Sequence, residues 1–97
     1  MSREGITSVS LVGDVGSVRR GEARGAAAIG FDLAISEAGT TTWVSVSLYD
    51  DLAKTHFNAI TTGARVAVVG RLRNRQVGQT TRTVHVVATQ ITIESRT

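Results

Sequence analysis

The segment TTWVSVSLYDDLAKTHFNAITTG, residues 41–63, changes its periodicity part way along. In its first nine residues apolar and polar side chains alternate, so that Val44, Val46 and Leu48 share one face. Alternation with a period of two is typical of a strand with one buried face. The pattern therefore predicts a strand over Thr41–Tyr49, and the alternation stops where the first aspartate follows.

The second half of this segment has the spacing of a helix. Its apolar residues recur at helical intervals over Asp50–Thr62, and Asp50 or Asp51 can cap the amino terminus. Gly63 follows where a left-handed residue commonly ends a helix. The sequence therefore predicts one short helix directly after a strand.

Four further segments alternate in the same way, two on each side of this strand and helix. They are Thr7–Gly13, Ala27–Ser36, Ala64–Arg75 and Thr80–Ile93. The predicted order is three strands, a helix and two strands in a single domain, residues 1–97. Short strands with a helix between the third and the fourth favour an all-β fold, the OB-fold, which is a five-stranded Greek-key barrel. A flat α+β sandwich is the alternative that periodicity leaves open.

Positive charge is concentrated in the last third of the chain. Residues 1–63 carry five basic and seven acidic side chains, whereas residues 64–97 carry six arginines and one acid, Glu94. Ten of the eleven basic residues are arginine, whose planar guanidinium can contact phosphate through two hydrogen bonds. This asymmetry indicates a negatively charged partner, of which nucleic acid is the commonest.

The arginines fall into two groups at predicted hairpins. GRLRNRQVGQTTR, residues 70–82, joins the last two strands, and GSVRRGEARG, residues 16–25, is expected to be a loop between the first two. In OB-folds the corresponding loops flank the binding surface. We therefore expect phosphate contacts from these arginines: Arg19, Arg20, Arg24, Arg71, Arg73, Arg75 and Arg82.

Two aromatic side chains share the polar face of the predicted third strand. Trp43 and Tyr49 lie at its ends, and the small Ser45 and Ser47 lie between them. Such a face can stack unpaired bases, at roughly 1–3 kcal/mol per base. The alternative is that Trp43 fills the core or a contact between subunits.

Other functions find little support in the sequence. The only histidines, His56 and His85, have no metal-binding spacing, and no motif places a base beside a nucleophile. We therefore expect neither an enzyme nor a bound metal or cofactor. The chain has no cysteine, no long apolar run and no signal-peptide pattern, which favours a cytoplasmic protein without a membrane partner.

The chain resembles the DNA-binding domain of bacterial single-stranded DNA-binding proteins over almost its whole length. The matching segments follow one another with the family's spacing: SVSLVGDVG (8–16), FDLAISE (31–37), TTWVSVSLYDDLAK (41–54) and GARVAVVGRLRNR (63–75). The resemblance implies a non-enzymatic OB-fold that assembles as a homotetramer or homodimer and binds single-stranded DNA without sequence preference. It implies roles in DNA replication, recombination or repair, with stacking at Trp43 and Tyr49 and basic contacts at Arg71 and Arg73.

Some positions depart from that family. Gly39 and Val77 stand where further stacking tryptophans are common, and Val44 stands where a histidine often lies at the subunit contact. The family's flexible acidic tail does not follow Thr97, so the sequence is either truncated or that of a tail-less relative. HFNAITTGARVAVVG, residues 56–70, also resembles primosomal replication protein N, a family of adaptors that act with replication-restart proteins. An OB module for protein contacts is the remaining alternative.

Overall fold

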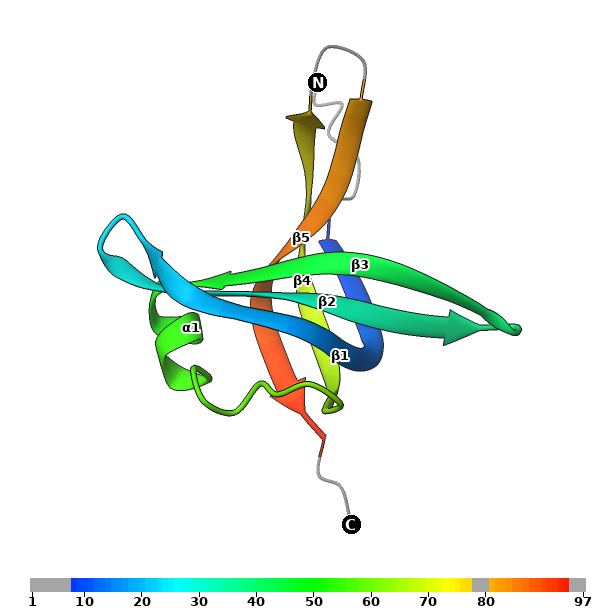
Figure 1. Ribbon diagram of the computed structural model, residues 1–97, viewed down its shortest axis with the longest axis horizontal. Coiled ribbons are helices and arrows are strands. Elements are labelled where there is room, and N and C mark those ends of the chain that lie inside the picture. Colours follow the sequence, from blue (N-terminus) through cyan, green and yellow to red (C-terminus); the bar gives the residue numbers. More distant parts are fainter. Residues whose placement is uncertain (1–7, 78–80, 95–97) are drawn as a thin grey trace.

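The computed structural model describes residues 8–77 and 81–94, with side chains described outside 74–77 and 81–84. It contains five strands and one helix (Figure 1). In chain order these are β1 (Ser8–Ala23), β2 (Ala26–Glu37), β3 (Thr40–Tyr49), α1 (Asp50–Thr55), β4 (Arg65–Val77) and β5 (Thr81–Ile93). The predicted order of strands and helix is confirmed.

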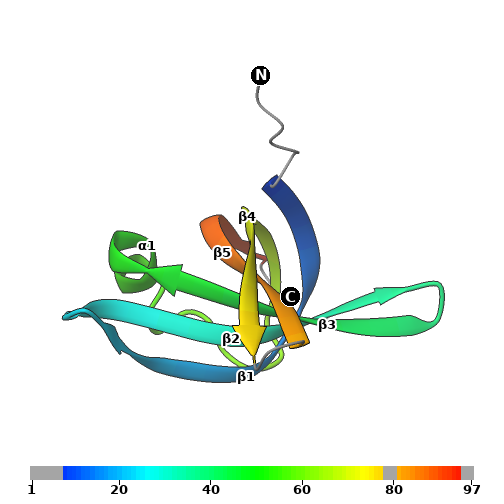
Figure 2. The same ribbon diagram turned by 90° about the horizontal axis from the view of Figure 1, so that it is seen from above.

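The strands form a closed barrel in the order β1-β2-β3-β5-β4. All neighbouring pairs are antiparallel except β3 and β5, which run parallel and close the barrel through Ser45↔His85, Val46↔Val86 and Ser47↔Val87. Seen from above, the strands enclose a common centre and α1 lies to one side (Figure 2). This is the predicted all-β OB-fold, and the flat sandwich is excluded.

One hydrophobic core fills the barrel. Its largest fully buried side chains come from every strand except β1 and from the segment after α1: Phe31, Ile29, Leu33, Leu48, Ile60, Val46, Val66, Val68 and Val86. On β3, Val46 and Leu48 are buried as the alternation predicts. Burial on alternate positions leaves the intervening side chains on the outside of the barrel.

The helix is shorter than the sequence predicts. α1 ends at Thr55, and turns cover most of residues 56–63. Asn58, Thr61 and Thr62 favour turns over helix interiors, which explains the early end. The helix follows Tyr49 without a side-chain cap, so the predicted aspartate cap is wrong. Gly63 has the expected positive φ of 93°, but it precedes β4 instead of ending the helix.

The segment expected to be an arginine-rich loop after the first strand is mostly strand. β1 continues through residue 23, with a bulge between Val15 and Val18 that interrupts the alternation. The turn to β2 consists only of Arg24 and Gly25, whose φ values are 55° and 81°. Two residues with positive φ are what a tight type I′ hairpin requires. Arg19 and Arg20 therefore belong to a strand and point in opposite directions.

Candidate nucleic-acid interface

The outward-pointing side chains of four adjacent strands form a continuous surface on the barrel, here called the outer face. The outer face consists of Asp32 of β2, Trp43, Ser45, Ser47 and Tyr49 of β3, His85 and Val87 of β5, Arg71 and Arg73 of β4, and Arg19 of β1. Ser45 pairs with Asp32 and His85, and His85 pairs with Arg73. Partners on neighbouring strands point to the same side of a sheet. The barrel thus brings the aromatic strand and the arginine strand onto one surface.

Trp43 is the largest apolar group on this surface. It is 61% exposed, so it does not fill the core. The indole extends across β2 as far as β1, because a Cβ built on Gly16 would lie 2.8 Å from its Cζ3 atom. Gly16 therefore gives the ring space to lie over the β1 backbone, and the remaining ring surface stays open.

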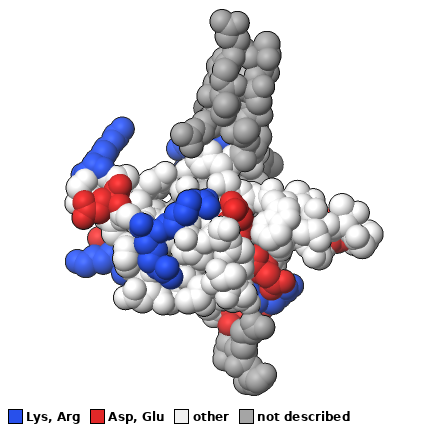
Figure 3. Space-filling view, viewed as in Figure 1, with Lys and Arg blue, Asp and Glu red and all other residues white. Residues whose placement is uncertain are grey.

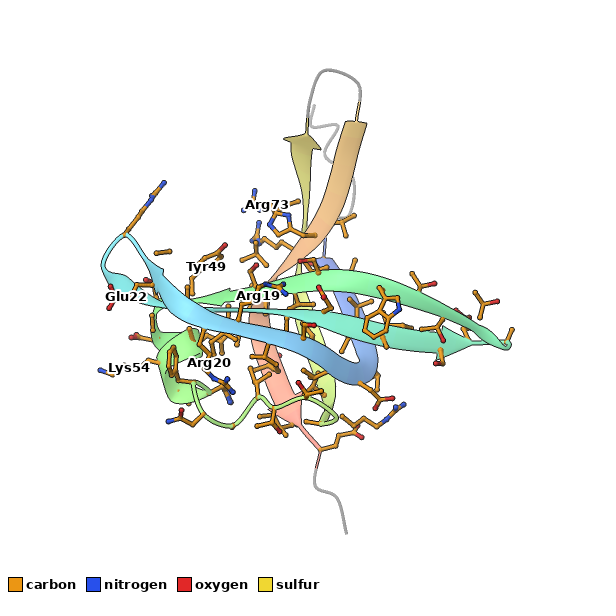
Figure 4. The ribbon with its side chains drawn as sticks, viewed as in Figure 1. Arg19, Arg20, Glu22, Tyr49, Lys54 and Arg73 are labelled. Carbon is orange, nitrogen blue, oxygen red and sulfur yellow. The ribbon has the colours of Figure 1, made fainter. Side chains whose placement is uncertain are left out.

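Tyr49 lies at the other end of β3 and is 41% exposed. It borders a shallow hollow of about 250 Å³, whose other lining residues include Arg19, Gly30 and Ser47. Figure 4 shows Tyr49, Arg19 and Arg73 toward the same side of the barrel. Trp43 and Tyr49 are separated by six residues, or roughly 20 Å of strand. Small serines between them leave that surface free of bulky side chains.

Arg19 extends from β1, at one edge of the outer face, over the neighbouring strand β2. It pairs with Gly30 of β2, and its guanidinium lies above that glycine, 3.6 Å from where a Cβ would be. Its Nη2 atom is 3.5 Å from a carboxylate oxygen of Asp32. Figure 3 shows basic side chains gathered near the middle of this view with acidic ones beside them. Arg19, which the sequence predicts to contact phosphate, thus forms an ion pair with an acidic side chain.

Arg20 points away from the outer face, although the sequence groups it with Arg19. Its guanidinium donates hydrogen bonds to the backbone carbonyl of Phe57, at 2.6 Å, and to that of Ile60. These bonds connect β1 to the turns that follow α1, and Figure 4 shows Arg20 on that side of β1. Arg20 therefore has a structural role, and the prediction that it contacts phosphate is not retained.

The remaining predicted arginines differ in how fully the structure describes them. Arg71 and Arg73 are exposed on β4, and Arg24 is exposed at the tip of the β1–β2 hairpin. Arg75 and Arg82 belong to the β4–β5 hairpin by their backbone pairing, but their side chains lie outside the described residues. The hairpin projects from the barrel next to the outer face (Figure 1).

His85 also belongs to the outer face, which the sequence did not indicate. It lies between Ser45 and Arg73, and its Nδ1 atom is buried without a hydrogen-bond partner. The alternation around the buried Val86 shows that the His85 side chain points outward. Its neighbours on the outer face, however, follow from the parallel pairing of β3 with β5. No local sequence signal reveals that pairing.

Other kinds of site are not visible in the part of the chain that the structure describes. Across residues 8–77 and 81–94 no group of three or more histidine or acidic side chains could hold a metal ion. No helix within those same ranges has the length and apolar character needed to cross a membrane. The outer face is therefore the surface on which a functional interpretation depends.

The chain was compared with curated sequences and with solved structures, and a solved structure has the same barrel fold. No curated protein sequence matches the chain. Among solved structures, the N-terminal domain of the PriB protein from Thermoanaerobacter tencongensis, described as dimeric, shares the fold. Its TM-score is 0.75 at 22% identity, and the match covers 93% of this chain and 98% of that one.

The sequence model of the single-strand binding protein family matches residues 6–96, nearly the whole chain. Proteins of this family bind single strands and are not enzymes, in agreement with the exposed aromatic and basic groups of the outer face. The chain belongs to the single-strand binding protein family.

Proposed function

We propose that this protein binds single-stranded DNA across the outer face, without sequence preference, during DNA replication, recombination or repair in the cytoplasm. The exposed indole of Trp43, held over Gly16, is the observation that carries the proposal. An aromatic ring that is 61% exposed offers a surface on which a base can stack. The family assignment supports the same ligand class.

Base stacking and phosphate contacts would both contribute to the binding of DNA. Trp43 and Tyr49 stack on bases at the two ends of β3, and the serines between them admit any base. Arg71 and Arg73 contact phosphates on one side and Arg19 on the other, across four strand intervals or roughly 19 Å. Arg24, Arg75 and Arg82 extend these contacts from the hairpins. Stacking and charge attraction do not read the base sequence.

Self-association is part of the proposal. The PriB domain that shares this fold is described as dimeric, and this supports a homodimer or homotetramer here. Light scattering coupled to size-exclusion chromatography would give the assembly size, and a monomer at all concentrations would contradict it. Contacts with replication-restart proteins remain a further expectation, testable with the assembled protein.

A fluorescence titration with oligo-dT tests the central claim. Trp43 is the only tryptophan, so quenching of its emission reports on this position alone. We expect strong quenching at low salt and weaker binding as salt increases. The Trp43→Ala variant, followed by the anisotropy of a labelled oligonucleotide, should lose roughly 1–3 kcal/mol of binding free energy.

Two results would contradict this function. Absence of both quenching and an anisotropy change at low salt would show that DNA is not the ligand. Emission that is already blue-shifted and inaccessible to a soluble quencher without DNA would instead favour the protein-contact alternative, with the aromatic face covered by another subunit. A matched control is Thr42→Ala, which removes an exposed neighbour on β3 outside the outer face and should bind normally.

A further inference from the structure

Asp32 is the one acidic side chain among the described residues that define the outer face, while Glu22 lines the hollow at its Tyr49 end. Asp32 lies on β2, directly beside Ser45 of β3, and its carboxylate is 3.5 Å from the guanidinium of Arg19. A carboxylate in the middle of a surface that binds a polyanion repels the ligand. Its presence there therefore needs a physical explanation.

Fold stability does not explain this pair. The side chains of Arg19 and Asp32 are 57% and 39% exposed, and they are joined by a single contact. Exposed pairs of this kind contribute little to folding because water and salt screen them and because both side chains lose freedom. Arg65, by comparison, contacts two carboxylates, those of Asp14 in the middle of β1 and of Glu94 just after β5. The Arg19–Asp32 pair connects two strands that the barrel already holds together.

The position of the pair suggests a role in binding. Arg19 lines the hollow beside Tyr49, so a strand stacked on Tyr49 would bring a phosphate near its guanidinium. The five N–H groups of arginine form the same fork-shaped contacts with a carboxylate and with a phosphate. A phosphate and the Asp32 carboxylate therefore compete for one guanidinium.

We infer that Arg19 and Asp32 form an exchangeable ion pair, in which a phosphate of the bound strand replaces the Asp32 carboxylate, so that Asp32 limits the affinity for single-stranded DNA. This inference rests on the proposed function. In the free protein the pair is neutral and adds nothing to the attraction of DNA. In the complex Arg19 contacts phosphate, and the nearby carboxylate lowers the net gain and favours release.

The test compares Asp32→Asn with the unchanged protein in oligo-dT titrations over a range of salt concentrations. The variant has nearly the same shape and loses only the charge. We expect its affinity to rise roughly threefold to tenfold at low salt. The slope of log affinity against log salt should steepen by up to about 0.7, the value for one neutralised phosphate on a single strand, because no displaced carboxylate then offsets the charge of Arg19.

A matched control removes the same charge elsewhere. Glu37 is exposed at the far end of β2, five residues from Asp32, and pairs with Thr40 beside the turn. Glu37→Gln should leave affinity and slope nearly unchanged. An equal gain in both variants would show that only the total charge matters and would overturn the inference.

The double variant Arg19→Gln with Asp32→Asn identifies the mechanism. If Asp32 acts through Arg19, removing the arginine should abolish most of the gain from Asp32→Asn. A full gain without Arg19, or weaker binding by Asp32→Asn alone, would overturn the exchange; the latter would show that Asp32 orients Arg19. If the unchanged protein shows no binding at all, the proposed function fails as well, so the two failures are distinguishable.

Discussion

A single residue on β1 decides how Trp43, the largest of the proposed stacking groups, is held. The Trp43 ring lies over Gly16, a position inside the β1 bulge, and a Cβ there would approach the ring carbons to 2.8 and 3.2 Å. Contacts below about 3 Å force a shift of the neighbouring group. The proposed stacking surface thus depends on a glycine that itself need not touch DNA.

We expect Gly16→Ala to displace the indole and to weaken oligo-dT binding by up to tenfold, since stacking on one base is worth roughly 1–3 kcal/mol. The emission maximum of Trp43 should shift in the free protein. Gly21→Ala on the same strand is the control, because nothing lies within 4 Å of a Cβ at that position. Normal affinity and an unchanged emission spectrum in Gly16→Ala would contradict the role of Gly16.

The neighbouring Arg19 and Arg20 offer a second comparison. Arg20 donates to two backbone carbonyls after α1, and we expect Arg20→Gln to lower the free energy of unfolding by about 1–2 kcal/mol while DNA affinity stays the same. Arg19→Gln should have the opposite profile, with weaker binding and nearly normal stability. Urea unfolding and oligo-dT titration of both variants measure this, and similar profiles would refute the assignment.

At the scale of elements, the junction between β3 and α1 carries backbone strain. Asp50 has a φ of 56°, a conformation that favours glycine, and its side chain does not cap the helix. We expect Asp50→Gly to raise the free energy of unfolding by about 1 kcal/mol, as measured in urea. Asp51→Gly, in the ordinary helical region, should lower it by a similar amount. A loss of stability in both variants would mean that the Asp50 side chain stabilises the junction.

The elements also show what could be predicted from sequence. Alternation on β2 and β3 identifies the buried positions Phe31, Leu33 and Val46, because burial on one face leaves a period of two. The β1 bulge breaks that period, so the strand could be followed only as far as Gly13 and its second half resembled a loop. Once residue 19 is known to lie on a strand, the alternation of side chains is enough to show that Arg19 and Arg20 point to opposite faces.

The composition of the outer face, the proposed binding surface, was predictable only in part for a similar reason. Trp43, Tyr49, Arg71 and Arg73 lie on strands that the alternation identifies, and the structure confirms that they share the outer face with one another. His85 and Asp32 join them through pairings between strands, and the β3–β5 pairing connects residues 40 positions apart. Such long-range register depends on the closure of the barrel, which local patterns do not encode.

At the scale of the whole molecule, the arginines of β4 should dominate the salt dependence. We expect Arg73→Gln to weaken binding equally for oligo-dT and oligo-dC and to flatten the salt slope by about 0.7. The same titrations at several salt concentrations measure both quantities. An unchanged slope, or a loss confined to one sequence, would contradict a phosphate contact. Arg65→Gln, which loses ion pairs away from the outer face, serves as the control.

The parallel contact of β3 with β5 has a consequence for folding. On the outer face Trp43 of β3 and Arg73 of β4 are joined through β5 at this contact, so the proposed binding surface is complete only in the closed barrel. A DNA strand that crosses from one to the other would bind the closed form in preference to any partly opened one. By mass action, DNA would then raise the melting temperature with its concentration. A single DNA strand would thus stabilise the parallel junction at which the barrel closes.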